Sequence, residues 1–384
     1  MIHFLTTCRF GKWWGCIPLL LVSFFLSAQS STRPEQVRIR YAKGFSVRYA
    51  GTYKIVHILS PFGKSTDTAR YLLIPRGKPR PKGFAGYEVV ETPVRSLVAM
   101  SSMHIGLLGF LGAEDVLTGL GNLKYVSSPK VIARIEAGKV KEVGKDQTLN
   151  EELVVAMHPD LVMAVGTPNA RLDRYETLRR AGIPVLVNSE WVETTPLARA
   201  EWVKLVAVLL NRETLVNQQF AKVEAEYNRL AALTRAVKTR PGVITGTAYK
   251  DSWFVPNGDS YMARFFKDAG ASYPWAHTRS TGSLPLNFET VFPVGLKADV
   301  WLNVGLTDAD TKKGVLGKDP RYAEFKAFKS GRMYNYSKRT NSRGSNDYWE
   351  SGAVSPHRVL ADLIRILHPE LLPTHELYYY QQVK

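Results

Sequence analysis

Runs of β-branched and aromatic residues, interrupted by glycine and proline, dominate the chain between residues 36 and 92. Such runs, separated by turn-forming residues, are typical of the strands of a sheet. The pattern predicts strands at residues 36–41, 45–49, 53–59, 69–74 and 87–91. Residues 76–82 combine four basic residues with two prolines, and we expect them to form an exposed loop rather than a binding site.

From residue 94 the apolar positions follow a different pattern, in which buried-strand runs alternate with amphipathic helices. Strands are expected at residues 95–100, 138–144, 161–165 and 185–188. Helices are expected at residues 102–111, 151–157 and 171–181, each followed by a glycine or a turn. This order predicts a parallel sheet with helices on both of its faces.

A long helical tract follows, with Thr195 as its N-cap and Pro196 at its first helical position. After a possible break at Asn211 and Arg212, apolar residues recur at helical spacing from residue 213 to residue 237. A single helix of about 25 residues would be roughly 37 Å long at ~1.5 Å per residue. A helix of that length can cross two lobes instead of packing within one.

A second set of alternating strands and helices begins after residue 241. Its expected strands are residues 242–247, 300–304 and 332–336, and its expected helices are residues 260–269, 288–296, 323–329 and 356–367. The predicted fold class is therefore α/β, with two Rossmann-like lobes joined by a single long rigid helix and an extra β-rich N-terminal segment. The expected divisions are residues 29–92 for this segment, 93–212 and 239–384 for the lobes, and 213–238 for the helix.

Residues 1–28 have the features of a secretory signal peptide. Arg9 and Lys12 precede an apolar core at residues 17–26, and small residues follow it. Because this core is short for a bilayer span, we expect the segment to be removed, with an uncleaved anchor as the alternative. We expect an exported, periplasmic protein that is soluble after cleavage. Cys16 lies before the apolar core, so no lipid anchor on a cysteine is expected.

Charge and cysteine content narrow the function classes. Both cysteines, Cys8 and Cys16, lie within the predicted signal peptide, so the mature chain would have none. This excludes thiol catalysis, disulfides, cysteine-bound zinc and iron–sulfur clusters. The formal net charge of +17 falls to +15 when Arg9 and Lys12 are removed. In an exported protein that charge favours anionic ligands, anionic partners or a membrane surface over nucleic acid.

One short pattern occurs in both lobes. Asn150-Glu151-Glu152 begins a helix that leads to Asp160 and a buried strand, and Asn287-Phe288-Glu289 begins a helix that leads to Asp299 and a buried strand. Asparagine caps with acidic residues in the first turn stabilise any helix by about 0.3–1 kcal/mol. A single copy of the pattern would favour helix capping as its only role. Because a copy occurs at the matching place in each lobe, capping alone and a shared function are about equally favoured.

With these features on view, the sequence resembles the class III periplasmic binding proteins, the solute-binding proteins of ABC importers that capture ferric siderophores, cobalamin or haem. The resemblance extends from about residue 94 to residue 372 and lies in the order and spacing of several motifs. These are Ser101-Ser102 with the helix to Gly112-Ala113, Glu152 with Pro159-Asp160-Leu161-Val162, Gly182-Ile183-Pro184-Val185, the long helix, Glu289 with Asp299, and the C-terminal helix.

The resemblance implies a ligand between the lobes and one glutamate on each lobe that docks onto arginines of a membrane permease. By position these glutamates would be Glu152 and Glu289, the second less firmly because its spacing to the aspartate is two residues longer. The implied partners are the permease with its ATPase and a small metal chelate. The protein itself would need no cofactor and would act as a monomer.

Candidate ligand-binding residues are those on loops at the carboxyl ends of strands, where open α/β sheets bind ligands. Ser101 and Ser102 stand at a helix start in the first lobe, where they can cap the helix or meet an anionic ligand. In the second lobe, aromatic and arginine side chains on two loops suit a flat or bulky anionic chelate. These candidates are Trp253, Tyr261, Trp275, Arg339, Arg343, Tyr348 and Trp349, with Trp253 and Trp349 as the preferred walls, although either ring can equally be ordinary packing.

Other classes of function find less support. The eight histidines include no pair four residues apart and no His-rich loop, so direct binding of a metal ion is not expected. The chain has no G-x-S-x-G elbow, phosphate loop or H-E-x-x-H motif, so an enzyme is not expected, although an exported hydrolase or a sensor on the same fold stays an alternative. Positive charge and the loop arginines favour a ferric siderophore as ligand, with cobalamin or haem as alternatives.

Overall fold

The computed structural model describes residues 35–59, 67–145, 148–166, 172–305 and 311–384. The predicted signal peptide and its cleavage site lie outside these residues. Residues 35–384 form one compact unit, so the lobe boundaries expected at residues 93, 213 and 239 stay predictions. None of the described helices is long and apolar enough to cross a membrane.

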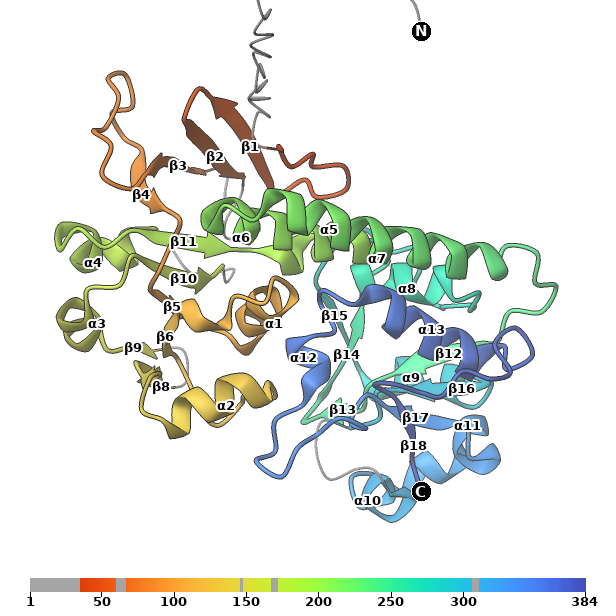
Figure 1. Ribbon diagram of the computed structural model, residues 1–384. Helices are drawn as coiled ribbons and strands as arrows, with labels where there is room; N and C mark the ends of the chain where they lie inside the picture. The colour runs from red at the N-terminus through yellow and green to blue at the C-terminus, as the bar shows by residue number, and fades with distance from the viewer. Residues whose placement is uncertain (1–34, 60–66, 146–147, 167–171, 306–310) are drawn as a thin grey trace, which may run out of the picture. The chain divides into compact units, whose positions relative to one another are not determined.

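The β-rich segment forms a four-stranded sheet in the order β1-β2-β3-β4 (Figure 1). Its strands are β1 (Phe45–Ala50), β2 (Tyr53–Leu59), β3 (Thr68–Pro75) and β4 (Glu88–Thr92). The first three pair antiparallel, and β3 pairs parallel with β4. The four strands predicted after residue 44 are therefore confirmed to within two residues.

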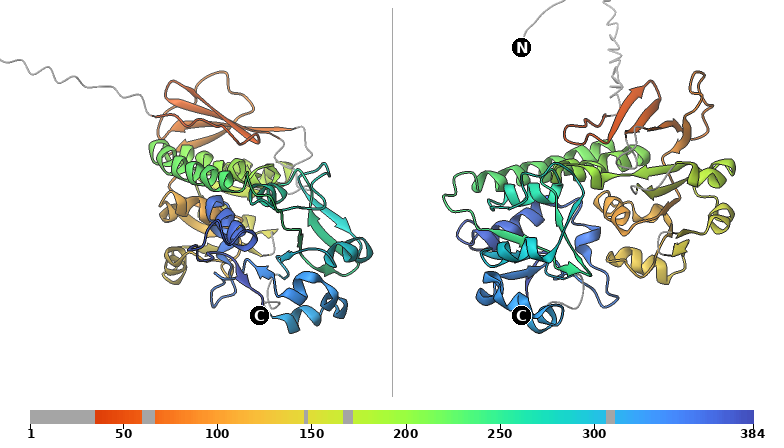
Figure 2. Two further views of the ribbon diagram at one scale, coloured as in Figure 1. Left: turned by 90° about the vertical axis from the view of Figure 1, so that its right-hand side faces the viewer. Right: turned by 180° about the vertical axis from the view of Figure 1, so that it is seen from behind.

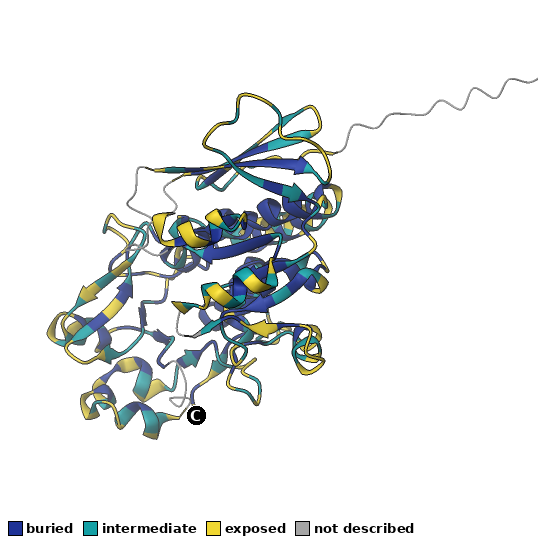
Figure 3. Cartoon of the chain, turned by 90° about the vertical axis from the view of Figure 1, so that its left-hand side faces the viewer, coloured by how far each residue is buried: buried dark blue, intermediate teal, exposed yellow. Residues whose placement is uncertain are grey.

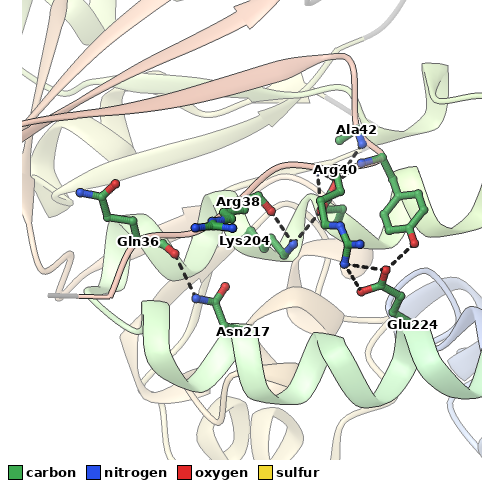
Figure 4. A network of polar contacts seen from close by, with 9 residues as sticks. Gln36, Arg38, Arg40, Ala42, Lys204, Asn217 and Glu224 are labelled. Carbon is green, nitrogen blue, oxygen red and sulfur yellow. Dashed lines mark hydrogen bonds and ion pairs between the residues drawn. The ribbon is translucent and has the colours of Figure 1, made fainter.

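The strand predicted at residues 36–41 is wrong, because these residues belong to no strand. Their backbone donors are used by a buried carboxylate. Glu201, which is 0% exposed, accepts hydrogen bonds of 2.7–3.1 Å from the backbone N–H groups of Arg40, Tyr41 and Ala42. Lys204 Nζ lies 2.6 Å from the same carboxylate and donates to the Arg38 carbonyl (Figure 4).

The first lobe contains a parallel five-stranded sheet in the order β11-β10-β5-β6-β7. Its strands are β5 (Leu97–Ala99), β6 (Leu117–Leu120), β7 (Lys141–Glu142), β10 (Leu161–Val165) and β11 (Val185–Asn188). The helices are α1 (Ser102–Phe110), α2 (Pro129–Glu136), α3 (Glu151–Met157) and α4 (Glu176–Arg180), and β8 (Gly144–Lys145) pairs with β9 (Thr148–Leu149). Short 3-10 turns occupy Glu114–Val116, Leu172–Tyr175 and Glu190–Val192.

Both faces of this sheet are covered, as predicted. Side chains such as Ala99 and Met163 pack into the large core cluster together with α1 and α6, whereas Val98 and Val162 on the other face pack with Val154 of α3 and residues of α4. The helix predicted at residues 171–181 is in fact a 3-10 turn followed by the short helix α4.

Three helices follow the first sheet: α5 (Pro196–Glu201), α6 (Val203–Leu210) and α7 (Glu213–Leu233). All residues of α6 are buried, and α6 packs against α7. The 21 residues of α7 make a helix of about 31 Å at ~1.5 Å per residue. It ends four residues earlier than predicted, where Thr234 Oγ1 donates a hydrogen bond of 2.6 Å to the Asp268 carbonyl.

The second lobe has two sheets (Figure 2). One, in the order β12-β16-β17-β18, is formed by β12 (Val243–Thr245), β16 (Val300–Leu302), β17 (Met333–Asn335) and β18 (Gln381–Gln382), the last of them antiparallel. The other is an antiparallel meander of β13 (Ala248–Tyr249), β14 (Ser252–Pro256) and β15 (Ser283–Leu286). The helices are α8 (Tyr261–Asp268), α9 (Phe288–Gly295), α10 (Lys312–Leu316), α11 (Lys326–Ser330), α12 (Asp347–Glu350) and α13 (Pro356–Leu367), with a 3-10 turn at Pro320–Glu324.

Buried residues occur in both the strands and the helices, and exposed residues gather on the outer faces of helices and on loops (Figure 3). In α7 the buried apolar residues recur three or four positions apart, as the sequence predicts; they are Val216, Phe220, Val223, Tyr227 and Leu230. This stripe faces the core on one side of the helix.

Replacement of the carboxylate that anchors residues 38–42 should destabilise the fold. Glu201→Ala would leave the buried ammonium of Lys204, 5% exposed, without its counter-ion and three backbone donors without their acceptor. We expect the free energy of unfolding to fall by about 3–5 kcal/mol in urea titrations.

The matched control is Glu226→Ala, which removes a solvent-exposed ion pair with Arg229. We expect this change to lower the free energy of unfolding by about 1 kcal/mol or less. Equal losses in the two variants would contradict the role assigned to Glu201.

Candidate functional site

The loops that follow the parallel strands of the two lobes meet at two helices, α1 and α12. Gly106 of α1 lies so close to α12 that a Cβ added there would stand 1.9 Å from the Glu350 carbonyl oxygen. A larger residue would push the two helices apart. α1 begins directly after β5, and α12 lies on the loop after β17, so the predicted loops of both lobes come together here (Figure 1).

Ser101 caps α1, as predicted. Its Oγ accepts a hydrogen bond of 3.2 Å from the backbone N–H of Met103, and both Ser101 and Ser102 are partly exposed. The capping role of Ser101 does not prevent contact with a ligand. A contact of either serine with a ligand stays a prediction.

An aromatic cluster follows β17 in the second lobe. Tyr336 and Tyr348 are stacked, with ring centroids 4.4 Å apart and planes inclined by 12°. The ring of Trp349 meets both edge-on at 5.2 Å. Burial, together with the nearby Tyr380 and Tyr261, raises the pKa of Tyr348, so its hydroxyl stays neutral. Tyr348 is therefore a buried support, whereas Trp349 is 42% exposed and offers an open face.

The predicted arginines of this loop differ in how they are used. Arg339 pairs with Asp347 at 2.5 Å and lies over the Tyr378 ring at 4.4 Å. The side chain of Arg343 is partly exposed and has no hydrogen bond or ion pair among the described residues. Arg343 is therefore the arginine of this loop that is available to an anion, and Arg339 serves mainly to hold the loop.

Tyr261, also a candidate, lies where the lobes meet. The Arg199 guanidinium of α5 stacks on its ring at 4.5 Å and pairs with Glu190 at 3.1 Å. The side chains of Arg199 and Glu190 are only 12% and 5% exposed. This buried pair, nine residues apart, has no helical or strand spacing, so the sequence analysis missed it.

Two of the predicted ligand-binding residues, the preferred wall Trp253 and the candidate Trp275, are buried in the structure. Trp253 is 0% exposed and donates a hydrogen bond of 2.9 Å to the Thr245 carbonyl, and Trp275 is 7% exposed and meets Tyr273 edge-on. The segment that was expected to be a loop contains strand β14, so alternate side chains point into the lobe. Trp253 packs in an aromatic core with Trp301, Tyr322 and Phe325, and neither tryptophan can serve as a wall for a ligand here.

Direct contacts tie the loop after β6 to the loop after β17. The Glu350 carboxylate accepts a hydrogen bond of 2.7 Å from the Ser127 backbone, Ser127 Oγ lies 2.9 Å from Ser345 Oγ, and Asn341 donates to the Val126 carbonyl at 2.9 Å. Glu350 is 3% exposed, and burial raises its pKa to about 7. The sequence gives no signal for Glu350, because its burial results from the approach of the other lobe.

His104 is a second residue without a sequence prediction. It lies in α1, is 1% exposed, and neither ring nitrogen has a hydrogen-bond partner among the described residues. Burial lowers its pKa to about 3, so it is neutral. Within the described ranges, no group of three or more histidine, aspartate, glutamate or cysteine side chains is arranged to hold a metal ion.

The pattern that occurs in both lobes has the same local structure in each copy. Asn150 caps α3 through a hydrogen bond of 3.0 Å from the Leu153 N–H, and Asn287 caps α9 through one of 2.8 Å from the Thr290 N–H. Asp160 accepts from the backbone N–H of Arg95 before β5, and Asp299 accepts from that of Gly242 before β12. In each lobe the aspartate thus joins the strand of the pattern, β10 or β16, to the strand beside it, β5 or β12.

Glu152 and Glu289 are exposed in the first turn of α3 and α9, respectively. The asparagine caps and the first-turn glutamates both stabilise their helices. The docking role of the two glutamates stays a prediction.

A protein-family model described as periplasmic binding protein matches residues 97–340, well over half of the chain. Two curated relatives, both from Methanocaldococcus jannaschii, are named uncharacterised lipoproteins. One is 28% identical over 297 residues, 74% of this chain and 67% of the relative; the other is 24% identical over 388 residues, 96% of this chain and 95% of the relative. Both relatives are named lipoproteins, whereas the sequence analysis predicts no lipid anchor on this chain.

Solved structures share the fold. The periplasmic haem-binding protein HutB of Vibrio cholerae has a TM-score of 0.54 at 18% identity and covers 69% of this chain and 97% of its own. A periplasmic haem-binding protein from Pseudomonas aeruginosa has a TM-score of 0.57 at 16% identity and covers 76% and 98%. The nickel–histidine complex of Helicobacter pylori CeuE has a TM-score of 0.54 at 16% identity and covers 74% and 86%.

The raised pKa of Glu350 predicts a pH dependence of stability that a glutamine should remove. The folded protein holds this proton more tightly than the unfolded chain, so the stability gained below pH 4.5 is lost as the pH rises through about 7. In Glu350→Gln we expect this loss, up to about 3 kcal/mol between pH 4.5 and 7.5, to be absent in unfolding titrations.

Glu136→Gln, at an exposed position of α2, is the control and should keep the wild-type pH profile. Parallel stability profiles of Glu350→Gln and wild type across this range would show that Glu350 does not titrate as its burial requires.

Proposed function

Because this chain belongs to the periplasmic binding protein family, we propose that it is the substrate-binding component of an ABC importer and captures a metal chelate between its two lobes. The family consists of binding proteins, not enzymes, and these work with the permeases of ABC transporters. The chemical task is then reversible, non-covalent binding followed by transfer to the permease. In this proposal the metal arrives already chelated by the ligand.

The observation that carries the proposal is the open face of Trp349 on the same segment after β17 as Arg343, whose side chain has no partner among the described residues. An exposed indole held edge-on by two buried tyrosines is a rigid apolar surface on which a flat ligand can stack. Arg343, six residues earlier in the chain, has a guanidinium without a partner among the described residues, and it can pair with carboxylate or phenolate oxygens of such a ligand. Ser101 and Ser102 contribute hydroxyl groups from the first lobe.

Charge favours a ferric siderophore over the alternatives. The mature chain would carry a net charge of +15 after loss of Arg9 and Lys12 from the +17 of the whole sequence. Anionic ferric chelates are attracted by such a surface. Haem and cobalamin are the alternative ligands, since a tryptophan face also suits a planar macrocycle, and two proteins of the same fold are titled as haem-binding proteins.

Docking on the permease is assigned to Glu152 and Glu289. They are exposed carboxylates on matching helices of the two lobes, so a permease with two-fold symmetry can meet one with each half. Pairing with arginines would fix the orientation of the complex more than it would add affinity.

Loss of the indole should weaken ligand binding without harm to the fold. We expect Trp349→Ala to reduce the binding free energy of the chelate by about 1–3 kcal/mol, because a stacked ring in a desolvated site contributes on that scale. The change is measured by calorimetric titration, since the variant lacks one fluorescent reporter.

Trp253→Phe is the control, a tryptophan of the same lobe that is fully buried. It should lower the melting temperature and leave the affinity unchanged. If Trp349→Ala behaves in the same way, Trp349 is a structural residue and no wall for the ligand.

Charge reversal at both docking positions should abolish transport. We expect Glu152→Arg combined with Glu289→Arg to leave folding and chelate affinity nearly unchanged and to eliminate permease binding and uptake into reconstituted vesicles, with each single variant intermediate. If the two glutamates only stabilise the N-terminal ends of their helices, the double variant would lose about 1 kcal/mol or less of unfolding free energy and uptake would be intact.

The control is Glu136→Arg combined with Glu370→Arg, which makes the same change of net charge at exposed positions of the two lobes. Normal uptake by the docking variant, or equal loss in the control, would remove the docking role from Glu152 and Glu289.

A further inference from the structure

A pocket that is separate from the loops after β5 and β17 lies where α5, α7 and α8 meet. Its volume is about 610 Å³, within the range of small-molecule sites. α5 belongs to the first lobe and α8 to the second, and the two helices are in contact. Tyr41 of the segment before β1 also lines the pocket. A molecule bound here would therefore touch the first lobe, the connecting helix and the second lobe together.

Basic side chains dominate the charge of this pocket. Arg235, Arg240, Arg264 and Lys267 line it against a single carboxylate, Asp268, for a net charge of +3. Asp268 is already satisfied, because it accepts two hydrogen bonds of 2.8 Å from Arg264 and one of 2.8 Å from the Tyr227 hydroxyl. It cannot also neutralise the remaining cations.

Three of the four cations are left without partners. Arg235, Arg240 and Lys267 are exposed, and their side chains have no hydrogen bond or ion pair among the described residues. They come from three places in the chain, namely the end of α7, the residues before β12, and α8. Like charges at such separate positions repel one another, and a bound anion would relieve that repulsion.

The remaining wall is apolar or neutral. Pro196, Leu197 and Ala231 line the pocket together with the ring of Tyr227, and Asn228 and Thr195 add polar groups. This combination suits an organic anion with a carbon framework better than a bare ion, since the wall can cover carbon atoms while the cations meet the charged ends.

We propose that this pocket binds a small organic polyanion that carries carboxylate or phosphate groups and that is free in solution. Arginine pairs with such groups through two parallel hydrogen bonds, which strengthens the interaction. Because its walls come from both lobes and from α7, occupancy would stabilise the arrangement of the lobes around the helix. The site is independent of the chelate, which is assigned to the loops after β5 and β17.

The test uses citrate and pyrophosphate as probes, at fixed ionic strength and with no chelate present. We expect one-to-one binding by calorimetry and a rise in melting temperature. The variant Arg235→Gln, Arg240→Gln, Lys267→Gln should fold, because these exposed side chains make no hydrogen bond or ion pair with other described residues. It should lose about tenfold or more in affinity for the probe.

A matched control removes three exposed lysines elsewhere, with Lys82→Gln, Lys139→Gln and Lys222→Gln, and should bind the probe as wild type does. Equal losses of probe affinity in the two triple variants would show that only the net charge of the protein matters, and this would overturn the proposed site. So would the absence of saturable binding by either probe.

Anionic phosphatidylglycerol vesicles form the second arm. Vesicle binding that depends on Arg235, Arg240 and Lys267, without binding of free citrate or pyrophosphate, would identify a lipid headgroup as the anion and overturn the proposal of a free one. Chelate affinity should be unchanged in the pocket variant, so failure here leaves the proposed transport function standing.

Discussion

The helix α7 is the constraint on which the arrangement of the two lobes depends. Its buried stripe packs against α6, which belongs to the first lobe, and it also contacts α13 of the second. Its far end is held by the hydrogen bond from Thr234 to the Asp268 carbonyl. A change in the angle between the lobes would have to bend this helix or repack its stripe. Large hinge motions in other folds occur in loops or at the ends of elements, so we expect closure around a ligand to be small.

Buried or partly buried acidic side chains that accept hydrogen bonds from backbone N–H groups fix the remaining connections. Glu201 and Glu193 hold residues 40–44 against the first lobe, Asp160 and Asp299 join neighbouring strands, and Asp362 holds the C-terminal residues 378–380. Each satisfies donors that a regular sheet or helix would otherwise pair. Asp362 acts nearest to the candidate site, because it accepts hydrogen bonds from the backbone N–H groups of Tyr379 and Tyr380, whose rings pack edge-on against Tyr348.

Local patterns predicted the elements that depend on local interactions. The helix α3, the strand β10 and the helix α13 have the predicted bounds, because apolar spacing, caps and turns determine them. Residues 36–41 have equally good strand propensity but are held by Glu201, which lies some 160 positions away. The local sequence predicts a loop at Trp253, because it does not reveal that β14 pairs with β13 and β15. The exposure of Trp349 and the burial of Glu350 likewise follow from contacts between distant segments, which apolar spacing does not encode.

The central claim is that the chain binds a metal chelate, and titration of the purified protein with a panel of chelates tests it most directly. The panel comprises ferric hydroxamate and catecholate siderophores, cyanocobalamin and haemin, with tryptophan fluorescence as the signal. The account predicts saturable one-to-one quenching by one class, with a ferric siderophore favoured, and none by the others. An absence of saturable binding across the whole panel would contradict it.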